Sequence, residues 1–290
     1  MAKSGLKTAT PYTGACVVMT TKHAKSVAVG PMFEQILGAA VVEYPLDTDA
    51  LGTFSGEVER EGTALECAQR KCEMGLDLIG ACYGVASEGS FGPHPYIPFI
   101  PGGQEILYFI DRKRNFHLHL STLCNETNYS MQAVDSLAAL QEFAETALFP
   151  SHALVVRPNV CQVGEMIFKG LTELADLQSA FYQSQRHSSD SRVWVETDMR
   201  AHLNPTRMSQ IGHLAHDLAR RLATLCPTCH APGWGMVNAE KGLSCEYCNE
   251  ATEMIALEVF GCVLCGYVER KERQDGLKSA PQMNCGFCNP

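Results

Sequence analysis

The sequence predicts an α/β fold, in which a layered mixed sheet with flanking helices is followed by a small C-terminal double zinc ribbon. Strand-like and helix-like segments alternate over the first 224 residues, a pattern typical of α/β domains. Four CxxC pairs then follow one amphipathic helix, and cysteine pairs at this spacing are typical of zinc ribbons. We therefore expect two domains, an α/β domain over residues 1–224 and a zinc-ribbon module over residues 225–290.

The first segments alternate between strand and helix. Residues 14–21 and 39–45 are short apolar runs rich in β-branched residues, and each predicts a strand. Between them, the apolar-periodic stretch 29–38 predicts a helix that ends at a glycine. Residues 46–63 are acidic and punctuated by glycine, so they predict a loop or a hairpin.

A second helix and a long loop come next. Thr63 is placed to cap a helix over residues 63–80, with Glu66 three positions on in a capping-box pattern. Residues 81–86 predict a buried strand. The glycines and prolines of residues 87–103 predict a loop.

The rest of the α/β part continues the alternation. Apolar runs predict strands at 105–112, which 117–121 would continue, and at 152–158 and 192–198. Helical periodicity predicts helices at 136–148 and 171–185. Asn204 and Pro205 then open a further helix, because Asn is a good N-cap and Pro suits the first helical position. Apolar side chains at three- and four-residue steps give this helix one buried face, and the helix leads directly to Cys226.

Composition excludes several classes of protein. Hydrophobic residues make up 46% and charged residues 19%, which excludes a disordered chain, a collagen-like chain and a coiled coil. The net charge of −9 disfavours nucleic-acid binding unless a local basic patch exists. No apolar run is long enough for a signal-peptide core or a membrane span, so we expect a cytoplasmic protein with no membrane partner. Reducing conditions there keep thiols free to bind metal.

The four CxxC pairs predict two metal ions. Each pair places two thiolates on one tight turn, and two turns complete a tetrahedral site with no open position. We therefore expect two structural Zn²⁺ ions, with mononuclear iron of the rubredoxin type as the alternative. The expected ligands are Cys226, Cys229, Cys245, Cys248, Cys262, Cys265, Cys285 and Cys288.

The pairing of the four turns has two alternatives. Sequential pairing joins the first turn to the second and the third to the fourth, whereas crossed pairing joins first to third and second to fourth. We favour sequential pairing, because each half then closes as an independent ribbon. Residues 201–290 carry eight Lys and Arg against nine Asp and Glu, so we expect structural support or contact with an unidentified protein in preference to nucleic acid.

Three places in the α/β part gather polar residues near strand ends, where ligands bind in open α/β sheets. The first is residues 20–25, whose Thr21, His23 and Lys25 could hold phosphate; the alternative is a polar loop. The second is residues 87–94, where Glu88 could bind a metal or activate water and Ser90 could contact a ligand; the alternative is a glycine-rich turn.

The third place is the acidic stretch before and within the second helix. Carboxylates of Glu57 and Glu61, together with the cation of Lys71, suit a Mg²⁺-dependent attack on a phosphate ester or anhydride. For any one of these acidic residues, a solvated loop is the better interpretation.

A fourth polar place runs from a strand end to the cap of the last helix. Its twelve residues, 196–207, hold more polar groups than capping requires. Asp198, Arg200, His202 and Arg207 are therefore candidate substrate-binding residues. The alternative is a scaffold, in which Asn204 only caps the helix and Asp198 forms a buried ion pair with Arg200 or Arg207.

Several enzyme signatures are missing from the sequence. It contains no G-x-S-x-G nucleophile elbow, no Walker A motif and no G-x-G-x-x-G. Serine hydrolases of that type and ordinary P-loop or dinucleotide folds are therefore disfavoured. The cysteines before residue 165 are interpreted as small core residues.

Taken together, TTKHAK, DTDALGTFSGEVER, ASEGSFGPHP, ETDMRAHLNPTRM and the CxxC pairs resemble a bacterial protein family of unknown function. The resemblance spans nearly the whole chain and is most specific where TDMRAHLNPTR leads to CPTC. It implies no established reaction.

A second resemblance covers about the first 110 residues. Thr21, His23 and Lys25 are similar to the T-x-N-x-x-K of the inosine-triphosphate pyrophosphatase superfamily. ECAQRKC, over residues 66–72, is similar to its E-N-A-x-x-K-A helix, and SEGS, over residues 87–90, lies where that superfamily has D-D-S-G. The chain departs from the pattern, since His23 and a cysteine replace asparagines and Ser-Glu replaces the paired aspartates.

This resemblance implies a mechanism. Glu88 and one of Glu57 or Glu61 would bind Mg²⁺, and Lys25 and Lys71 would hold a triphosphate. Water would attack the α-phosphorus and release pyrophosphate.

The first functional hypothesis is therefore a metal-dependent hydrolase of a nucleotide or other phosphorylated small molecule. The second is a non-enzymatic binding or adaptor protein whose ribbons contact protein or RNA. A third places the site at residues 198–207, with the ribbon as one wall.

Overall fold

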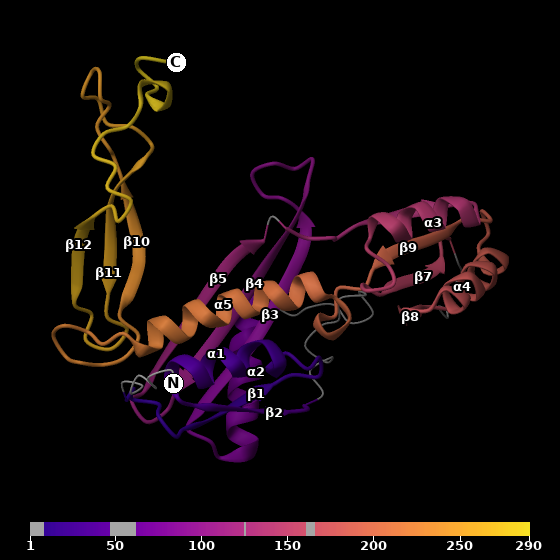
Figure 1. Ribbon diagram of the computed structural model, residues 1–290, viewed down its shortest axis with the longest axis horizontal. Helices are drawn as coiled ribbons and strands as arrows, with labels where there is room; N and C mark the ends of the chain where they lie inside the picture. Colours follow the sequence, from indigo (N-terminus) through magenta and orange to yellow (C-terminus); the bar gives the residue numbers. More distant parts are fainter. Residues whose placement is uncertain (1–8, 47–61, 125, 161–165) are drawn as a thin grey trace, which may run out of the picture.

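The computed structural model describes residues 9–46, 62–124, 126–160 and 166–290. The chain is elongated, with a central α/β body, a second small sheet with its own helices at one end, and a three-stranded ribbon at the other (Figure 1). The α/β class predicted from the sequence is confirmed. The bounds of 1–224 and 225–290 for the two domains stay a prediction.

The central sheet has five strands in the order β2-β1-β3-β4-β5. Its strands are β1 (Cys16–Thr20), β2 (Ala40–Tyr44), β3 (Tyr83–Pro93), β4 (Pro101–Asp111) and β5 (Phe116–Cys124). β1 runs parallel to both β2 and β3, whereas β3, β4 and β5 are joined as antiparallel hairpins. The predicted mixed sheet is therefore present.

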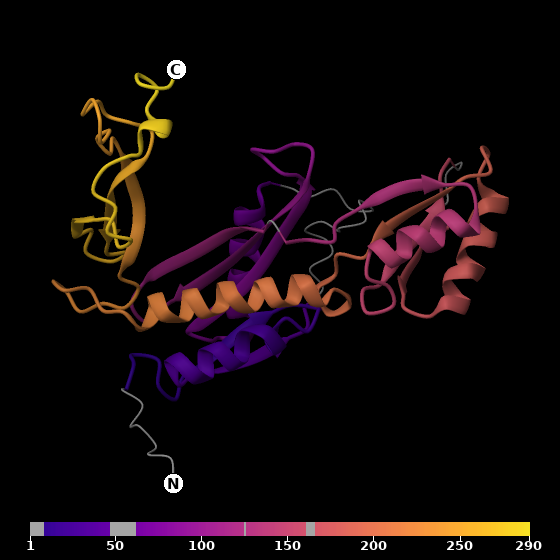
Figure 2. The same cartoon turned by 45° about the horizontal axis from the view of Figure 1, so that its top comes forward.

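Helices cover both faces of this sheet. One face packs against α1 (Ser26–Leu37) and α5 (Pro205–Ala223), which lie side by side (Figure 2). The other face packs against α2 (Ala64–Ile79) through a smaller cluster that includes Cys72, Leu76 and Tyr108. The predicted capping box at the start of α2 is present, with reciprocal Thr63 and Glu66 hydrogen bonds.

The loop predicted over residues 87–103 is wrong for most of its length. β3 continues to Pro93 and β4 starts at Pro101, so that only 94–100 connect them. Pro93 and Pro101 lie opposite each other at the loop end of the hairpin, where the missing N–H groups do not interrupt the ladder. Residues 117–121, expected to continue the preceding strand, lie in β5, which folds back on β4.

A second sheet lies between β5 and α5 in the sequence. Its four strands are ordered β6-β9-β7-β8, all antiparallel: β6 (Met131–Val134), β7 (Leu154–Pro158), β8 (Phe168–Leu171) and β9 (Val193–Thr197). Helices α3 (Leu137–Thr146) and α4 (Leu174–His187) pack on it and share a separate core with it. The sequence predicted β7, β9 and both helices, but the four-residue strands β6 and β8 are too short to show a period.

The C-terminal ribbon is a three-stranded antiparallel sheet of β10 (Gly235–Lys241), β11 (Ile255–Gly261) and β12 (Val268–Glu272). Short 3-10 turns at Ala201–Leu203 and Gln282–Asn284 complete the elements. Among the helices that the model describes, none combines the length and the apolar character required to span a bilayer.

Candidate functional site

Two different kinds of site emerge from the fold. One is a group of charged side chains in the central body, which we call the central polar cluster: Lys25, Lys71, Glu88, Glu105 and Arg207. These five residues come from five different elements or caps, namely the N-cap of α1, then α2, β3, β4 and α5. The other site is formed by the eight cysteines of the ribbon.

The central polar cluster lies where β1 ends and β3 continues. β1 pairs with β3 at Val18 and Met19, and the chain then turns away toward α1. The Nζ atom of Lys25 donates to the main-chain oxygen of Ser87 at 3.1 Å and to its Oγ at 3.2 Å. Lys25 therefore binds the edge of β3 just beyond the carboxyl end of β1, which runs parallel to it. Ligand sites in α/β sheets are commonly found at this position.

The cluster spans both faces of the sheet. Gly89 pairs with Glu105 across the hairpin, so the side chain of Glu105 shares a face with that of Ser87, and Glu88 points to the opposite face. Glu88 forms an ion pair with Lys71 on α2. On the α5 face, the Arg207 guanidinium meets Glu105, with Nε at 2.5 Å from Oε1 and Nη2 at 3.3 Å from Oε2.

These charges are buried and influence one another. Lys25, Glu88, Glu105 and Arg207 are each at most 5% exposed. Burial, followed by the nearby Arg207 cation, lowers the pKa of Lys25 to about 7, against the opposing effect of Glu88 and Glu105. Because Lys25 interacts with charges on both faces, the cluster acts electrostatically as one site.

Gly89 permits the close approach of Arg207 and Glu105. A Cβ atom at position 89 would lie 2.4 Å from Nη2 of Arg207 and 2.8 Å from Oε1 of Glu105. Any larger residue would push the ion pair apart, so the glycine in SEGS is needed for packing at the cluster. The guanidinium also lies over the ring of Phe91, 5.1 Å from its centroid.

A histidine pair adjoins the cluster. The rings of His23 and His202 stack with centroids 5.1 Å apart. Burial, followed by the cation of Lys25, lowers the pKa of His23 to about 4, so this imidazole is neutral at physiological pH. Its Nδ1 atom is buried without a hydrogen-bond partner among the residues that the model describes.

Asp198 and Asn204 hold the segment that carries His202 and Arg207. Asp198 accepts hydrogen bonds from the main chain and guanidinium of Arg200 and from the N–H of Gly170. Asn204 caps α5 by accepting from the N–H of Arg207 at 3.0 Å. The alternative ion pair of Asp198 with Arg207 does not form, because Arg207 is engaged by Glu105 and by the main-chain oxygen of Met199.

Four predicted site residues remain, of which the structure describes two. Thr21 is buried and accepts from the N–H of His23 at 3.1 Å, so it shapes the turn after β1. Ser90 is exposed on β3, opposite Gln104. Glu57 and Glu61 lie outside the described residues.

Glu105 is the one charged member of the cluster that sequence reasoning missed. A signal was available, because Glu105 is an isolated carboxylate at the start of the apolar run 106–110. A charge that enters a buried strand requires a partner, which here is Arg207 from a helix about 100 positions later in the chain.

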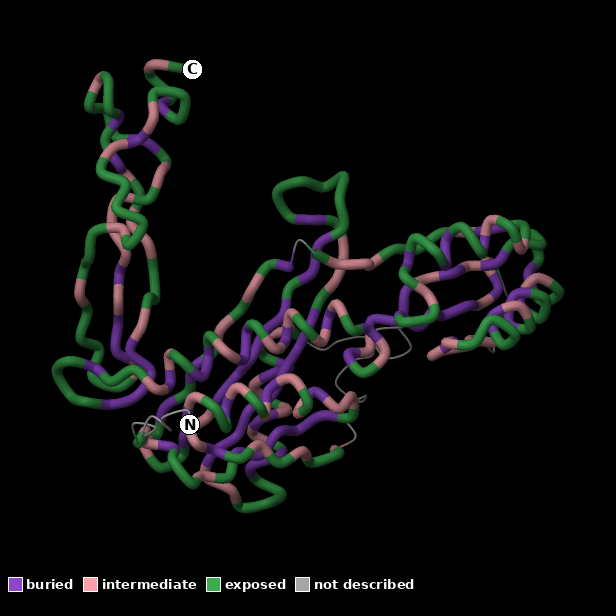
Figure 3. Tube along the Cα trace, in the orientation of Figure 1, coloured by how far each residue is buried: buried purple, intermediate pink, exposed green. Residues whose placement is uncertain are grey.

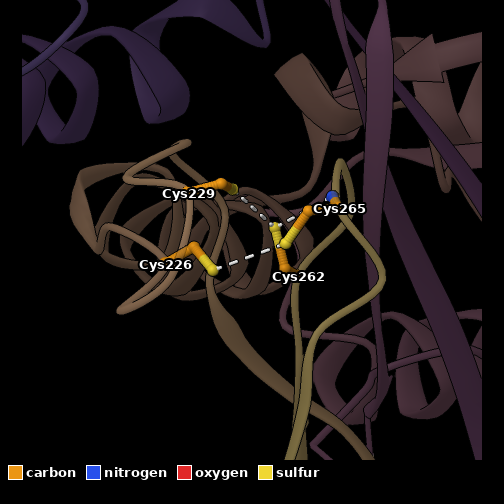
Figure 4. A group of neighbouring side chains, drawn as sticks. All are labelled: Cys226, Cys229, Cys262 and Cys265. Carbon is orange, nitrogen blue, oxygen red and sulfur yellow. Dashed lines mark hydrogen bonds between the residues drawn. The ribbon is translucent and has the colours of Figure 1, made fainter.

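The ribbon cysteines form two compact groups. Cys226, Cys229, Cys262 and Cys265 form one, and Cys245, Cys248, Cys285 and Cys288 form the other; within each group all Sγ atoms lie within 4.8 Å of one another. We call the group next to α5 the proximal group (Figure 4) and the other the distal group. Each group could hold one metal ion, so the predicted pair of four-cysteine sites is supported.

The sulfur separations suit a tetrahedral ion. Sγ atoms of Cys226 and Cys265 are 3.8 Å apart, those of Cys229 and Cys262 are 3.6 Å apart, and those of Cys248 and Cys285 are 3.6 Å apart. A tetrahedron with zinc–sulfur bonds of about 2.3 Å has edges of about 3.8 Å. The donor set and its geometry therefore fit Zn²⁺.

The predicted sequential pairing of the turns is wrong, since the first turn joins the third and the second joins the fourth. β10 carries the chain from the first turn to the far end of the ribbon, and its seven residues span about 24 Å. The antiparallel β11 returns it to the near end, and β12 leads away again. Odd-numbered turns therefore meet at one end and even-numbered turns at the other.

Only the proximal group is packed on the central body. Cys226 and Cys262 share a small core with Trp234, and Val263 of the second turn contacts the main core of the central sheet. The distal group has no such contact among the described core residues.

A family model matches residues 71–290, and its description is a domain of unknown function, DUF6671. The chain belongs to this family. The matched region starts at Lys71 in α2 and includes Glu88, Glu105, Arg207 and all eight ribbon cysteines. No curated protein matches the chain. The family therefore fixes no reaction, and the geometry of the two sites carries the functional argument.

Proposed function

We propose that the chain hydrolyses a nucleotide or other phosphorylated small molecule at the central polar cluster, and that two zinc ions hold the ribbon in shape. The observation that carries the proposal is the convergence of Lys25, Lys71, Glu88 and Arg207 at the end of β1. Each of the four polar places singled out in the sequence contributes one residue to this location, and Lys71 of α2 is the one from the third place.

The charge balance favours an anionic ligand. Lys71 and Arg207 each have a carboxylate partner, whereas the ammonium of Lys25 is held by the neutral oxygens of Ser87. A phosphoryl group near Lys25 would supply the negative charge that stabilises this buried cation. The orphaned Nδ1 of neutral His23, near Lys25, could donate a further hydrogen bond to an oxygen of the ligand.

Magnesium enters this proposal through Glu88. The carboxylate of Glu88 would bind the ion in place of the ammonium of Lys71. Lys71 would then be available to bind the phosphate. When bound, Mg²⁺ neutralises charge that develops on the phosphate oxygens. Lys25 and Arg207 would orient the phosphoryl group. A water molecule would attack the phosphorus while the P–O bond to the leaving group breaks, and the proton lost by the water would pass to solvent or to the departing oxygen.

The ribbon has a structural part in the proposal. Four thiolates around each Zn²⁺ leave no position for a substrate, so the ions fold the ribbon and perform no chemistry. Free thiols at these spacings are consistent with the cytoplasm. The acidic balance of the ribbon favours a small molecule over nucleic acid as the ligand.

A panel of nucleoside di- and triphosphates and sugar phosphates tests the proposal. Protein with measured zinc content is assayed for release of phosphate and pyrophosphate with Mg²⁺ or Mn²⁺. We expect at least one compound to be hydrolysed, and Lys25→Met and Glu88→Gln to abolish the activity. Gln183→Ala, on the remote helix α4, is the matched control and should retain it. Absence of turnover and of binding for the whole panel would remove the proposal.

A second function is supported by the free end of the ribbon. Tyr247, Met283 and Phe287 are each 75% exposed near the distal group, which suits an adaptor that contacts a protein. Pull-down with the wild-type chain and with Tyr247→Ser/Phe287→Ser tests this. A partner that both proteins retain equally would show that this apolar end is not the contact.

A further inference from the structure

The two cysteine groups of the ribbon differ in how accessible their cysteines are to solvent. Each group has two buried cysteines, one from each of its turns. The other two are exposed in the proximal group, Cys229 and Cys265, and half-buried in the distal group, Cys248 and Cys288. Because a thiolate must be accessible to react with an oxidant, the proximal group is the more open of the two to oxidation.

Each exposed cysteine of the proximal group faces a buried cysteine of the other turn (Figure 4). The Sγ atom of Cys229 lies 3.6 Å from that of Cys262, and the Sγ atom of Cys265 lies 3.8 Å from that of Cys226. The sulfurs of a disulfide are about 2.0 Å apart, so a shift of less than about 2 Å would bring either pair to bonding distance. An exposed thiol that becomes oxidised therefore has a second thiol beside it with which to react.

The proximal group also lies at the joint between the ribbon and the central body. The N–H groups of Gly233 and Trp234 both donate to the main-chain oxygen of Thr224 at 3.1 Å, which folds the first turn back on the end of α5. A Cβ atom at Gly233 would lie 3.2 Å from Val263 of the group's other turn and 3.7 Å from Leu118 of β5, so this joint is closely packed. The far end of the ribbon, which carries the distal group, stands away from the central body (Figure 3).

We propose that the proximal group is a site of reversible oxidation by hydroperoxides, at which a disulfide between its two turns replaces the bound ion. The inference rests on the structural zinc ions of the proposed function and is independent of the hydrolysis. Thiols that bind zinc are held as thiolates, and the thiolate is the form that attacks a peroxide.

The reaction has two steps. The thiolate of Cys229 or Cys265 attacks one oxygen of hydrogen peroxide, the O–O bond breaks, and a sulfenic acid forms while hydroxide leaves. The buried thiolate of the other turn then attacks that sulfur, an S–S bond forms, and the S–O bond breaks with loss of a second hydroxide. Both hydroxides take up protons from solvent and become water. The two thiolates together lose the two electrons that the peroxide gains.

The disulfide explains why the oxidation is reversible. A site that has lost two of its four ligands releases its ion, but the new bond keeps the two turns linked. A thiol reductant reopens the disulfide, and the four cysteines are then still placed to bind zinc again. The distal group, with the same spacing between its Cys248 and Cys285 sulfurs but without exposed cysteines, should react more slowly.

Titration of the full chain with hydrogen peroxide tests the proposal, on protein whose zinc content has been measured. Released zinc is followed with a chelating dye, and disulfides are located by peptide mass spectrometry after free thiols are blocked. We expect one ion per chain to be released before the other, with a disulfide that joins Cys229 to Cys262 or Cys226 to Cys265. A thiol reductant and added zinc should restore the lost ion.

A pair of matched variants assigns the release to the exposed thiols. Cys229→His/Cys265→His keeps four ligands at the proximal site, because two cysteines and two histidines also bind zinc. The early phase of zinc release should be about tenfold slower in this variant, since an imidazole cannot form a sulfenic acid or a disulfide. Cys248→His/Cys288→His makes the same change in the distal group and should leave the early phase unchanged.

The outcomes separate this inference from the proposal on which it rests. A chain that holds fewer than two zinc ions before peroxide is added would contradict the structural zinc sites, and this inference with them. Two bound ions that leave at one rate, or a first disulfide within the distal group, would overturn the inference alone. An unchanged early phase in Cys229→His/Cys265→His would also overturn it. If that variant does not fold, the position of the first disulfide in the wild type still decides.

Discussion

The ribbon and the central polar cluster are built on opposite plans. Each ribbon group takes four identical ligands from two short turns, and the ligand spacing within a turn is visible in the sequence. The cluster takes five charged residues from five elements spread over residues 25–207. Each cysteine group could hold an ion, and with that ion bound the first plan takes its stability from it. The second depends on the fold around it, so the two should fail in different ways.

The largest expected effect comes from removing one ribbon ligand. Cys262→Ser should lose the proximal ion, and structural zinc sites contribute about 10 kcal/mol of folding free energy. Since Val263 packs on the main core, this variant should also destabilise the central body. Zinc content by mass spectrometry of the native protein and thermal unfolding check both results.

The matched control lies at the other end of the ribbon. Cys248→Ser should lose the distal ion and leave the unfolding of the central body unchanged, because the described core residues connect only the proximal group to it. If both variants lowered the stability of the central body equally, the distinction between the two groups would be lost.

The buried ion pair of the cluster gives the next largest effect. Glu105→Gln leaves the guanidinium of Arg207 buried without its carboxylate, and such a loss costs about 3 to 5 kcal/mol. Urea unfolding measures the difference in the free energy of unfolding. Glu253→Gln breaks the exposed pair with Lys241 and should change the free energy of unfolding far less, because water screens that pair. If both variants lost the same free energy of unfolding, burial would not make the Glu105–Arg207 pair harder to break than an exposed pair.

These two regions also differ in how far the sequence predicts them. The cysteine spacing predicted the eight cysteines that form the two groups, but the crossed pairing depends on strand directions, which the spacing does not encode. Lys25, Glu88 and Arg207 were recognisable as polar residues near strand or helix ends. That Arg207 meets Glu105 was not predictable, because a contact between α5 and β4 is set by packing over the whole sheet.

The fold shows the same division. Helix α5 and the strand β1 were predicted correctly, because α5 shows one helical period over its length and β1 is a continuous apolar run. β3 was predicted too short, since glycine and proline signal a loop locally, although an antiparallel partner can keep them in a strand.

Lys25 gives a prediction with a pH dependence. Its pKa in the folded protein is about 7, below its ordinary value of 10.5, so the unfolded chain binds more protons between these two values. The stability of the wild type should therefore rise with pH across this window, by about 2 to 3 kcal/mol between pH 7 and pH 9. Lys25→Met removes the titrating group.

The measurement is the free energy of unfolding of both proteins at pH 7 and pH 9. The increase in the free energy of unfolding between pH 7 and pH 9 should be smaller in Lys25→Met than in the wild type, by the amount that the titration of Lys25 contributes. An identical pH dependence in the two proteins would show that the ammonium is not buried as the structure has it. A phosphate ligand should reduce the dependence, because it stabilises the charged form of Lys25.

The smallest expected effect concerns the cap that positions the cluster. Asn204→Ala removes the side-chain oxygen that accepts from the N–H of Arg207, and the cap alone contributes about 1 kcal/mol. The buried amide of Asn204 also donates to Oδ1 of Asn128 at 2.9 Å, and this bond is lost as well. Ser136→Ala removes an exposed cap from α3, in the second sheet, whose bond is 3.4 Å long, and it should cost less. Only the Asn204 cap is adjacent to the segment that brings His202 and Arg207 to the cluster, so Asn204→Ala alone should weaken phosphate binding. Calorimetry at a temperature where unfolding experiments show both variants to be folded separates the positioning of the cluster from the stability of the fold.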